Sequence, residues 1–435
     1  MNTIIQIYAK LNKSNLARSF TATLVGSGLS KVILALATFL FANELSKLEF
    51  GEFSFVRNTL NTILCMCALN FMSLCTKFTV ESEKSESSLK RIVILFLFSI
   101  ALCMIVGFTL LLLPDYIMVI ILGSKSVTFF FRLIGLLLPL FMLQPLLEGV
   151  LRGLMKFKLI GYMQTITAIL FVVFVYVGIK FNGLDGAICG ILFYYSLYSI
   201  LSLVVVFKLK PFTGFVGKIK SLRSESGVIR KMILPVFLMS FFEAPILWIA
   251  QVLLSKFDSM EAVGSMSAIF QLRNMMILIP SYMFNTFVAY AGKMNAEGQY
   301  RMYFKKFNQL SRMLVIIGLG FAFLCSVFSV PLLGLYGECY RGEYIPLIIS
   351  NLEVPLLLLI GLWKIDLVIQ EHQNQLLYSS FCWNVLWMAL FIPSLYIGLK
   401  PLESFFITQL VAVLFYAIWL FIIFNNDKKR LIYEK

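Results

Sequence analysis

The sequence predicts an all-α integral membrane protein with about 12 transmembrane helices. Of its 435 residues, 60% are hydrophobic and 14% are charged, whereas soluble proteins carry about 25% charged residues. Apolar runs of about 20 residues, the length that crosses the hydrocarbon core of a bilayer, recur from one end of the chain to the other. No polar stretch between these runs is long enough for a soluble domain.

The expected helices follow from the apolar runs in order. The first, 19–42, is longer than the roughly 7–15 apolar residues of a secretory signal, so we expect an uncleaved helix. Residues 116–122 either lengthen the third helix or re-enter the membrane. The eleven further expected helices are 51–74, 92–113, 126–149, 158–179, 183–207, 229–254, 262–290, 312–335, 344–368, 375–398 and 401–424.

The distribution of Lys and Arg predicts the orientation of these helices. Most of these residues lie in the two termini and beside the loops that follow the even-numbered helices. Because positive residues concentrate on the cytoplasmic side of a membrane, both termini are expected to be cytoplasmic. The net charge of +15 is then expected to anchor the protein to anionic lipid headgroups. Nucleic acid is not an expected partner, since the basic residues lie beside helix ends.

The second half of the sequence repeats the first at a spacing near 216 residues. Arg57-Asn58 recurs as Arg273-Asn274, Leu138-Pro139-Leu140 as Val354-Pro355-Leu356, and Gly51 falls opposite Gly264. Six helices per half is an even number, so the halves share one orientation and are related by a pseudo-two-fold axis along the membrane normal. The predicted parts are an N-terminal six-helix bundle at 1–207, a basic cytoplasmic linker at 208–231, a C-terminal six-helix bundle at 232–424 and a cytoplasmic tail at 425–435.

Three local features resemble one known family. They are a Gly-x-Phe-Ser start to the second helix, a central Lys31 in the first, and the segment Leu147-Glu148-Gly149-Val150-Leu151-Arg152-Gly153 at the end of the fourth. Together with twelve helices in 435 residues, they resemble the Wzx-type O-antigen and polysaccharide flippases of the multidrug/oligosaccharidyl-lipid/polysaccharide (MATE-like) exporter superfamily.

This resemblance implies a function, a location and partners. The expected activity is the movement of an undecaprenyl-diphosphate-linked oligosaccharide, such as an O-antigen unit for lipopolysaccharide biosynthesis, from the cytoplasmic to the periplasmic leaflet by alternating access. The expected location is the bacterial cytoplasmic (inner) membrane. The resemblance also allows a polysaccharide polymerase and a chain-length regulator as partners.

Independently of the resemblance, seven charged residues inside the predicted spans are candidates for a functional site. A charge at the middle of a lipid-facing helix costs roughly 2.5–3.5 kcal/mol, so seven would cost about 20 kcal/mol, more than the typical net stability of about 5–15 kcal/mol. Most of them therefore have to face a water-filled cavity or one another. They are Lys31, Arg57, Arg273, Lys364, Glu243, Glu353 and Asp366.

These residues predict a site for an anionic substrate. Arg binds phosphate in bidentate geometry and Lys supplies a compact positive charge, so both suit a diphosphate or an acidic sugar. The predicted substrate-binding residues are Lys31, Arg57, Arg273, Lys364, Asn58 and Asn274. The predicted ion-coupling residues, which take up H+ or Na+ to drive the cycle, are Glu243, Glu353 and Asp366. The competing role is structural: Lys31 and Glu243 can form an interhelical ion pair, and the two Asn can join helices.

Other functions leave weaker signals in the sequence. Gly123-Ser124-Lys125-Ser126 lacks the Gly-Lys adjacency of a phosphate-binding loop, so ATP coupling is not expected. A multidrug/cation antiporter of the same superfamily is the closest alternative, and a membrane polysaccharide polymerase a distant one. No catalytic residue, metal site or cofactor other than the coupling ion is expected, since His372 is the one His and no CxxC pair occurs.

Overall fold

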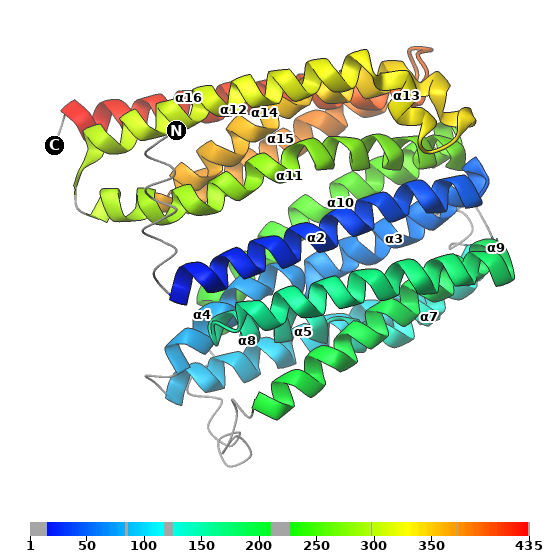
Figure 1. Ribbon diagram of the computed structural model, residues 1–435, viewed down its shortest axis with the longest axis horizontal. Helices are drawn as coiled ribbons and strands as arrows, with labels where there is room; N and C mark the ends of the chain where they lie inside the picture. The colour runs from blue at the N-terminus through cyan, green and yellow to red at the C-terminus, as the bar shows by residue number, and fades with distance from the viewer. Residues whose placement is uncertain are drawn as a thin grey trace. The chain divides into compact units, whose positions relative to one another are not determined.

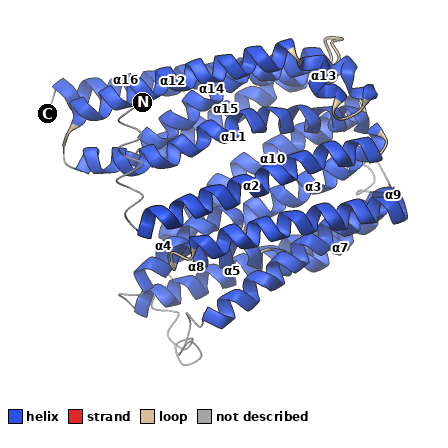
Figure 2. Cartoon of the chain, viewed as in Figure 1, coloured by secondary structure: helices blue, strands red, loops and turns tan. Residues whose placement is uncertain are grey.

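The computed structural model describes residues 15–82, 86–116, 125–209, 227–296, 298–370 and 372–433. Every secondary-structure element in these ranges is a helix (Figure 1, Figure 2). Eight helical segments among the described residues are long and apolar enough to cross a membrane. The predicted all-α membrane fold class is therefore confirmed. The ambiguous run at 116–122 lies outside the described residues, apart from Tyr116.

In the first half, each predicted span is found, and two are interrupted. The elements are α2 (Asn15–Glu44), α3 (Lys47–Cys67), η1 (Leu69–Phe71), α4 (Met72–Ser82), α5 (Glu86–Leu112), α7 (Lys125–Phe141), α8 (Leu143–Gly153) and α9 (Phe157–Leu209). The span predicted at 51–74 is broken at Ala68, whose φ of −150° and ψ of −44° leave the helical region. The span predicted at 126–149 is divided into α7 and α8 shortly after Pro139, which has no backbone N–H to donate.

The long helix α9 contains two spans joined by a sharp turn. Asn182 has φ −147° and ψ 29°, and Gly183 has φ 53° and ψ −130°. The two arms pack closely, because a Cβ atom on Gly186 would lie 1.9 Å from the carbonyl oxygen of Gly178. The predicted separation into helices at 158–179 and 183–207 is thus confirmed.

In the second half, the helices are found in the predicted order. They are a π-helical turn η3 (Ile229–Ile233), α10 (Leu234–Phe257), α11 (Met260–Ala296), α12 (Tyr300–Val327), α13 (Ser329–Gly334), η4 (Glu338–Glu343), α14 (Tyr344–Ile369), α15 (Gln373–Ser394) and α16 (Pro401–Tyr433).

Two helix boundaries in this half differ from the prediction. Helix α12 begins at Tyr300 rather than near 312, because Tyr303, Phe304 and Phe307 form a buried stripe along one face of the added turns. The charged residues between them hide this stripe from a hydropathy average. Helix α16 continues past 424 to Tyr433, and Leu431 in its last turns is 5% exposed.

The chain forms two compact units. Unit 1 comprises Met1–Ala37 and Glu52–Trp248, and unit 2 comprises Thr38–Gly51 and Ile249–Lys435. Within unit 2, the repeat-related residues Gly51 on α3 and Gly264 on α11 bring two backbones together, since a Cβ on Gly51 would lie 1.9 Å from the carbonyl oxygen of Met260. The predicted bundle boundaries stay a prediction, and most of the predicted linker, 210–226, lies outside the described residues.

Candidate functional site

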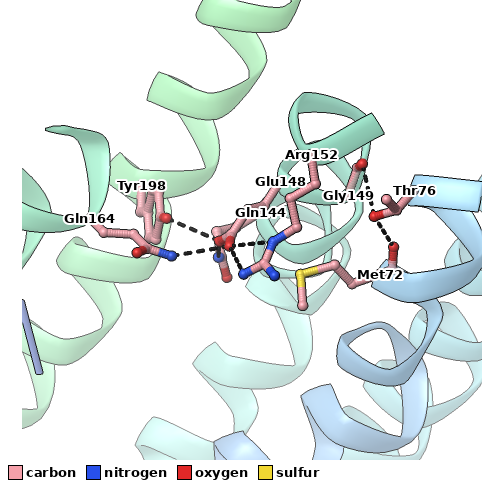
Figure 3. Close-up of polar contacts among 8 residues, drawn as sticks. All are labelled: Met72, Thr76, Gln144, Glu148, Gly149, Arg152, Gln164 and Tyr198. Carbon is pink, nitrogen blue, oxygen red and sulfur yellow. Dashed lines mark hydrogen bonds and ion pairs between the residues drawn. The ribbon is translucent and has the colours of Figure 1, made fainter. Parts of the chain in front are cut away.

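A buried carboxylate organises the polar interior of unit 1. Glu148 on α8 is 6% exposed and accepts hydrogen bonds from four side chains (Figure 3). The donors are Arg152 Nη2 at 2.7 Å, Gln164 Nε2 at 3.0 Å, Gln144 Nε2 at 3.1 Å and the Tyr198 hydroxyl at 3.2 Å. Arg152 Nε adds a second bond at 3.2 Å. The charge of Glu148 is thus balanced and its oxygens are fully used, as a buried carboxylate requires.

The local sequence of α8 explains why these side chains meet. Glu148 and Arg152 are four residues apart and share one helix face. Gly149 and Gly153 share the adjacent face, which packs against α4: a Cβ on Gly149 would lie 2.7 Å from the Met72 carbonyl oxygen. The Thr76 hydroxyl lies 2.9 Å from that carbonyl oxygen and 3.1 Å from the Gly149 carbonyl oxygen (Figure 3). One face of α8 therefore fixes the helix, and the other presents the ion pair.

Two predicted substrate-binding cations lie near this network in unit 1. Lys31 on α2 has an exposed side chain and lies within electrostatic range of Arg152. Arg57 on α3 is half-buried, and Tyr194 lies within electrostatic range of both Arg57 and Glu148. The Arg152 side chain is 38% exposed, so part of its guanidinium is accessible beside the buried carboxylate. The network therefore combines three cationic side chains with the carboxylate of Glu148.

Unit 2 contains a second buried network on three helices. Arg273 Nη1 on α11 donates to Glu353 Oε2 on α14 and, at 3.1 Å, to Gln409 Oε1 on α16. Glu353 is 0% exposed and Arg273 9%. The Arg273 guanidinium also lies over the Phe270 ring at 4.3 Å. Within the described residues, Arg273 Nε and Glu353 Oε1 have no hydrogen-bond partner. A predicted substrate residue and a predicted ion-coupling residue are thus paired.

The remaining predicted site residues occupy varied surroundings. Lys364 is half-buried with its Nζ 5.6 Å from the centre of the Tyr416 ring, and Asp366 is 1% exposed and accepts a hydrogen bond from Tyr303. Asn58 is half-buried and Asn274 is exposed. Glu243 lies on α10, but its side chain is outside the described residues, so the predicted Lys31–Glu243 pair stays a prediction.

The family follows from the sequence itself. A sequence model of polysaccharide biosynthesis proteins matches residues 16–291, which include α8 and the whole of its network. The chain belongs to the polysaccharide biosynthesis protein family. A search of curated protein sequences finds no match.

Solved structures show the fold of this polysaccharide biosynthesis protein. An inward-facing multidrug resistance MATE family transporter of the MOP superfamily matches with a TM-score of 0.76 and 14% identity, covering 94% of this chain and 98% of that one. A MOP superfamily transporter from Pyrococcus furiosus, for which a binding pocket of reverse polarity suggests a different function, has a TM-score of 0.71, 14% identity and 96% coverage of both chains. The Vibrio cholerae MATE transporter VcmN in its bent form has a TM-score of 0.61, 17% identity and 98% coverage of both. The chain therefore has the two-lobed fold of MATE transporters.

Several side chains in these two networks are not predicted from the sequence. Glu148 lies inside the predicted span 126–149, so the criterion that selects Glu353 also selects Glu148. Its spacing from Arg152 is a second signal. Gln164, Tyr198 and Gln409 carried no such signal, because neutral polar residues are common in membrane helices and only the packing shows which of them meet a charge.

Proposed function

We propose that this protein is a flippase that moves a lipid-linked oligosaccharide, carried on undecaprenyl diphosphate, from the cytoplasmic to the periplasmic leaflet of the bacterial inner membrane. The match of residues 16–291 to polysaccharide biosynthesis proteins carries this proposal. The MATE fold supports a transporter rather than a polymerase. In this proposal both termini are cytoplasmic, as the Lys and Arg distribution predicts.

The network in unit 1 supports an anionic substrate. Lys31, Arg57 and Arg152 bring three positive charges, and Glu148 neutralises one of them. The remaining positive charge attracts an anion, and Arg152 keeps further N–H groups beyond the two that bond to Glu148. In this proposal these three residues bind the diphosphate when it leaves water, and Asn58 contacts sugar hydroxyls.

The Arg273–Glu353 pair in unit 2 supports a role in coupling substrate movement to a driving ion. Because Arg273 and Glu353 are paired, an anion that binds Arg273 competes with the carboxylate, and Glu353 is then free to bind the driving ion. We place Arg273 and Lys364 among the residues that the substrate reaches during the cycle, with Asn274 beside them. Glu353, Asp366 and Glu243 are the carboxylates to which the proposal assigns the driving ion, H+ or Na+.

Complementation of a deletion strain tests the proposal. We expect loss of the gene to abolish surface polysaccharide and the wild-type gene to restore it, while Lys31→Ala and Arg57→Ala restore much less at equal membrane abundance. Arg341→Ala is the control, because Arg341 lies in η4 and pairs with the exposed Glu338. Full polysaccharide on the surface of the deletion strain would refute the assignment.

The multidrug antiporter is the second candidate, because several structures of the same fold are drug transporters. Such a protein would make the deletion strain sensitive to cationic dyes and leave surface polysaccharide unchanged. Measuring both phenotypes in one strain therefore separates the two functions.

A further inference from the structure

The end of unit 2 that carries the C-terminus holds a cluster of titratable side chains, of which the proposed function uses only Asp366. Helices α12, α14 and α16 pack side by side there (Figure 1). The cluster comprises Tyr303, Asp366, Gln370, His372, Asp427 and Arg430. An apolar core surrounds it, including Phe304, Phe307 and Phe424.

Two carboxylates in this cluster are buried close to each other. Asp366 is 1% exposed and Asp427 6%, and Asp427 lies within electrostatic range of both Asp366 and Tyr303. Tyr303 donates to Asp366 Oδ1. Asp366 Oδ2 is buried and has no hydrogen-bond partner among the described residues. The cluster therefore holds two buried carboxylates, and one of their oxygens is left without a partner among the described residues.

His372 connects Asp427 to the surface. Its Nδ1 lies 2.9 Å from Asp427 Oδ2, and its Nε2 lies 3.4 Å from Arg430 Nη2. A neutral imidazole with its proton on Nδ1 satisfies both contacts, since it donates to Asp427 and accepts from Arg430. The Arg430 side chain is 55% exposed and also lies 3.8 Å from Asp427 Oδ1. The His372 side chain is itself 19% exposed, so solvent reaches the imidazole.

We propose that Asp366 and Asp427 form a proton-binding site that fills through His372. A proton from solvent binds Nε2 of His372, the Nδ1 proton passes to Oδ2 of Asp427, and the carboxyl pair retains it while the imidazole becomes neutral again. The pair changes from two negative charges to one.

Polar and charged side chains from three helices and from the turn after α14 face this site. Tyr303, Gln370, Asp427 and His372 face Asp366, and Asp427 also meets Arg430. Because three helices contribute, protonation alters the electrostatic balance between α12, α14 and α16. The site depends on the proposed transport function only for its use in coupling, and proton binding itself is measurable without any substrate.

Infrared difference spectroscopy of the full-length protein in lipid nanodiscs, recorded between acidic and alkaline pH, tests the site. We expect a carbonyl band of a protonated carboxylic acid to disappear as pH rises, and Asp366→Asn or Asp427→Asn to remove it or shift its midpoint by about one pH unit or more. Asp185→Asn on α9 is the control and should leave the band unchanged. Tyr303→Phe retains both carboxyls and should shift the midpoint, which covers the case in which the Asn variants do not fold.

A pH-jump measurement tests whether the proton reaches the carboxyl pair through His372. His372→Gln should leave the midpoint unchanged and slow the appearance of the band by about tenfold or more, as loss of a proton-transfer group predicts. The site is refuted if both Asn variants and Tyr303→Phe titrate like the wild type, or if added Na+ at constant pH changes the band as protons do. If the band appears at an unchanged rate in His372→Gln, the proton does not enter through His372. Loss of export with a normal titration would instead concern the proposed function.

Discussion

Arg273 on α11 and Glu353 on α14 form an ion pair in the interior of unit 2. The sequence predicts that Arg273 binds the substrate and Glu353 the driving ion, and in the proposed function the pairing makes these two ligands compete. An anion that takes the guanidinium leaves Glu353 without its partner, and a proton on Glu353 leaves Arg273 available. Because such coupling is reciprocal, each ligand changes the affinity for the other by the same factor.

Breaking this pair from one side should destabilise the protein strongly. Arg273→Ala leaves a buried, unpaired Glu353, and we expect the free energy of unfolding to fall by about 3–5 kcal/mol. The double variant Arg273→Met with Glu353→Leu should retain most of the stability, since no charge is left buried. Thermal unfolding in one detergent measures all three proteins.

An exposed pair provides the comparison for this experiment. Arg341 and Glu338 lie 2.7 Å apart with side-chain exposures of 49% and 78%. We expect Arg341→Ala to change the free energy of unfolding by about 0–1 kcal/mol. Equal losses in Arg273→Ala and Arg341→Ala would mean that Glu353 carries no charge in the folded state.

Arg152 should matter for transport through its geometry as well as its charge. Arg152→Lys keeps the charge but loses the paired Nε and Nη2 bonds to Glu148. If a charge-assisted hydrogen bond from Arg152 to the substrate, worth about 1.5–3 kcal/mol, is lost as well, binding of the substrate weakens roughly tenfold or more. We expect the initial rate of polysaccharide export at low substrate supply to fall accordingly.

Arg132 provides a matched control for this variant. It pairs at 2.7 Å with Asp115 in the same unit, but both side chains are more exposed. Arg132→Lys should leave the export rate unchanged. An export rate for Arg152→Lys as high as that of Arg132→Lys would exclude a positioned guanidinium at this site.

The glycines of α8 should tolerate no side chain. A Cβ on Gly153 would lie 2.4 Å from Thr79 Cβ, so Gly153→Ala forces α4 and α8 apart and should cost about 1–3 kcal/mol of stability. Gly320→Ala on α12 is the control, because nothing lies within 4 Å of the added Cβ and Ala favours a helix by about 0.5–1 kcal/mol. Thermal unfolding should therefore move in opposite directions for the two variants, and a common direction would contradict the packing.

Much of the fold could be predicted from the sequence because membrane helices follow a simple physical rule. An apolar run of bilayer length forms a helix, since no water is present to satisfy its backbone. The rule fails where a helix leaves the bilayer. The first turns of α12 carry Arg301, Lys305 and Lys306, which lower the hydropathy, although Tyr303 and Phe307 pack in the core.

The candidate site was less predictable, because a sequence shows which charges are buried but not which of them meet. Arg273 and Glu353 are 80 residues apart, and no local pattern links them. His372 appears isolated in the sequence, yet it contacts Asp427, which lies 55 residues further along the chain. Such contacts depend on how three helices pack, and this is decided by the fit of many apolar side chains.

The turn within α9 depends on a glycine at position 183. Gly183 has φ 53° and ψ −130°, a conformation that side chains with a Cβ rarely adopt, so Gly183→Ala should destabilise the protein by about 1–3 kcal/mol. Gly342→Ala in η4 should have little effect, because its Cβ would meet nothing within 4 Å. Since the strain acts where the two arms of α9 reverse direction, limited proteolysis near Asn182 should increase in the Gly183 variant only. Equal resistance of the two variants to protease and to heat would show that the turn at Asn182 and Gly183 does not hold the two arms together.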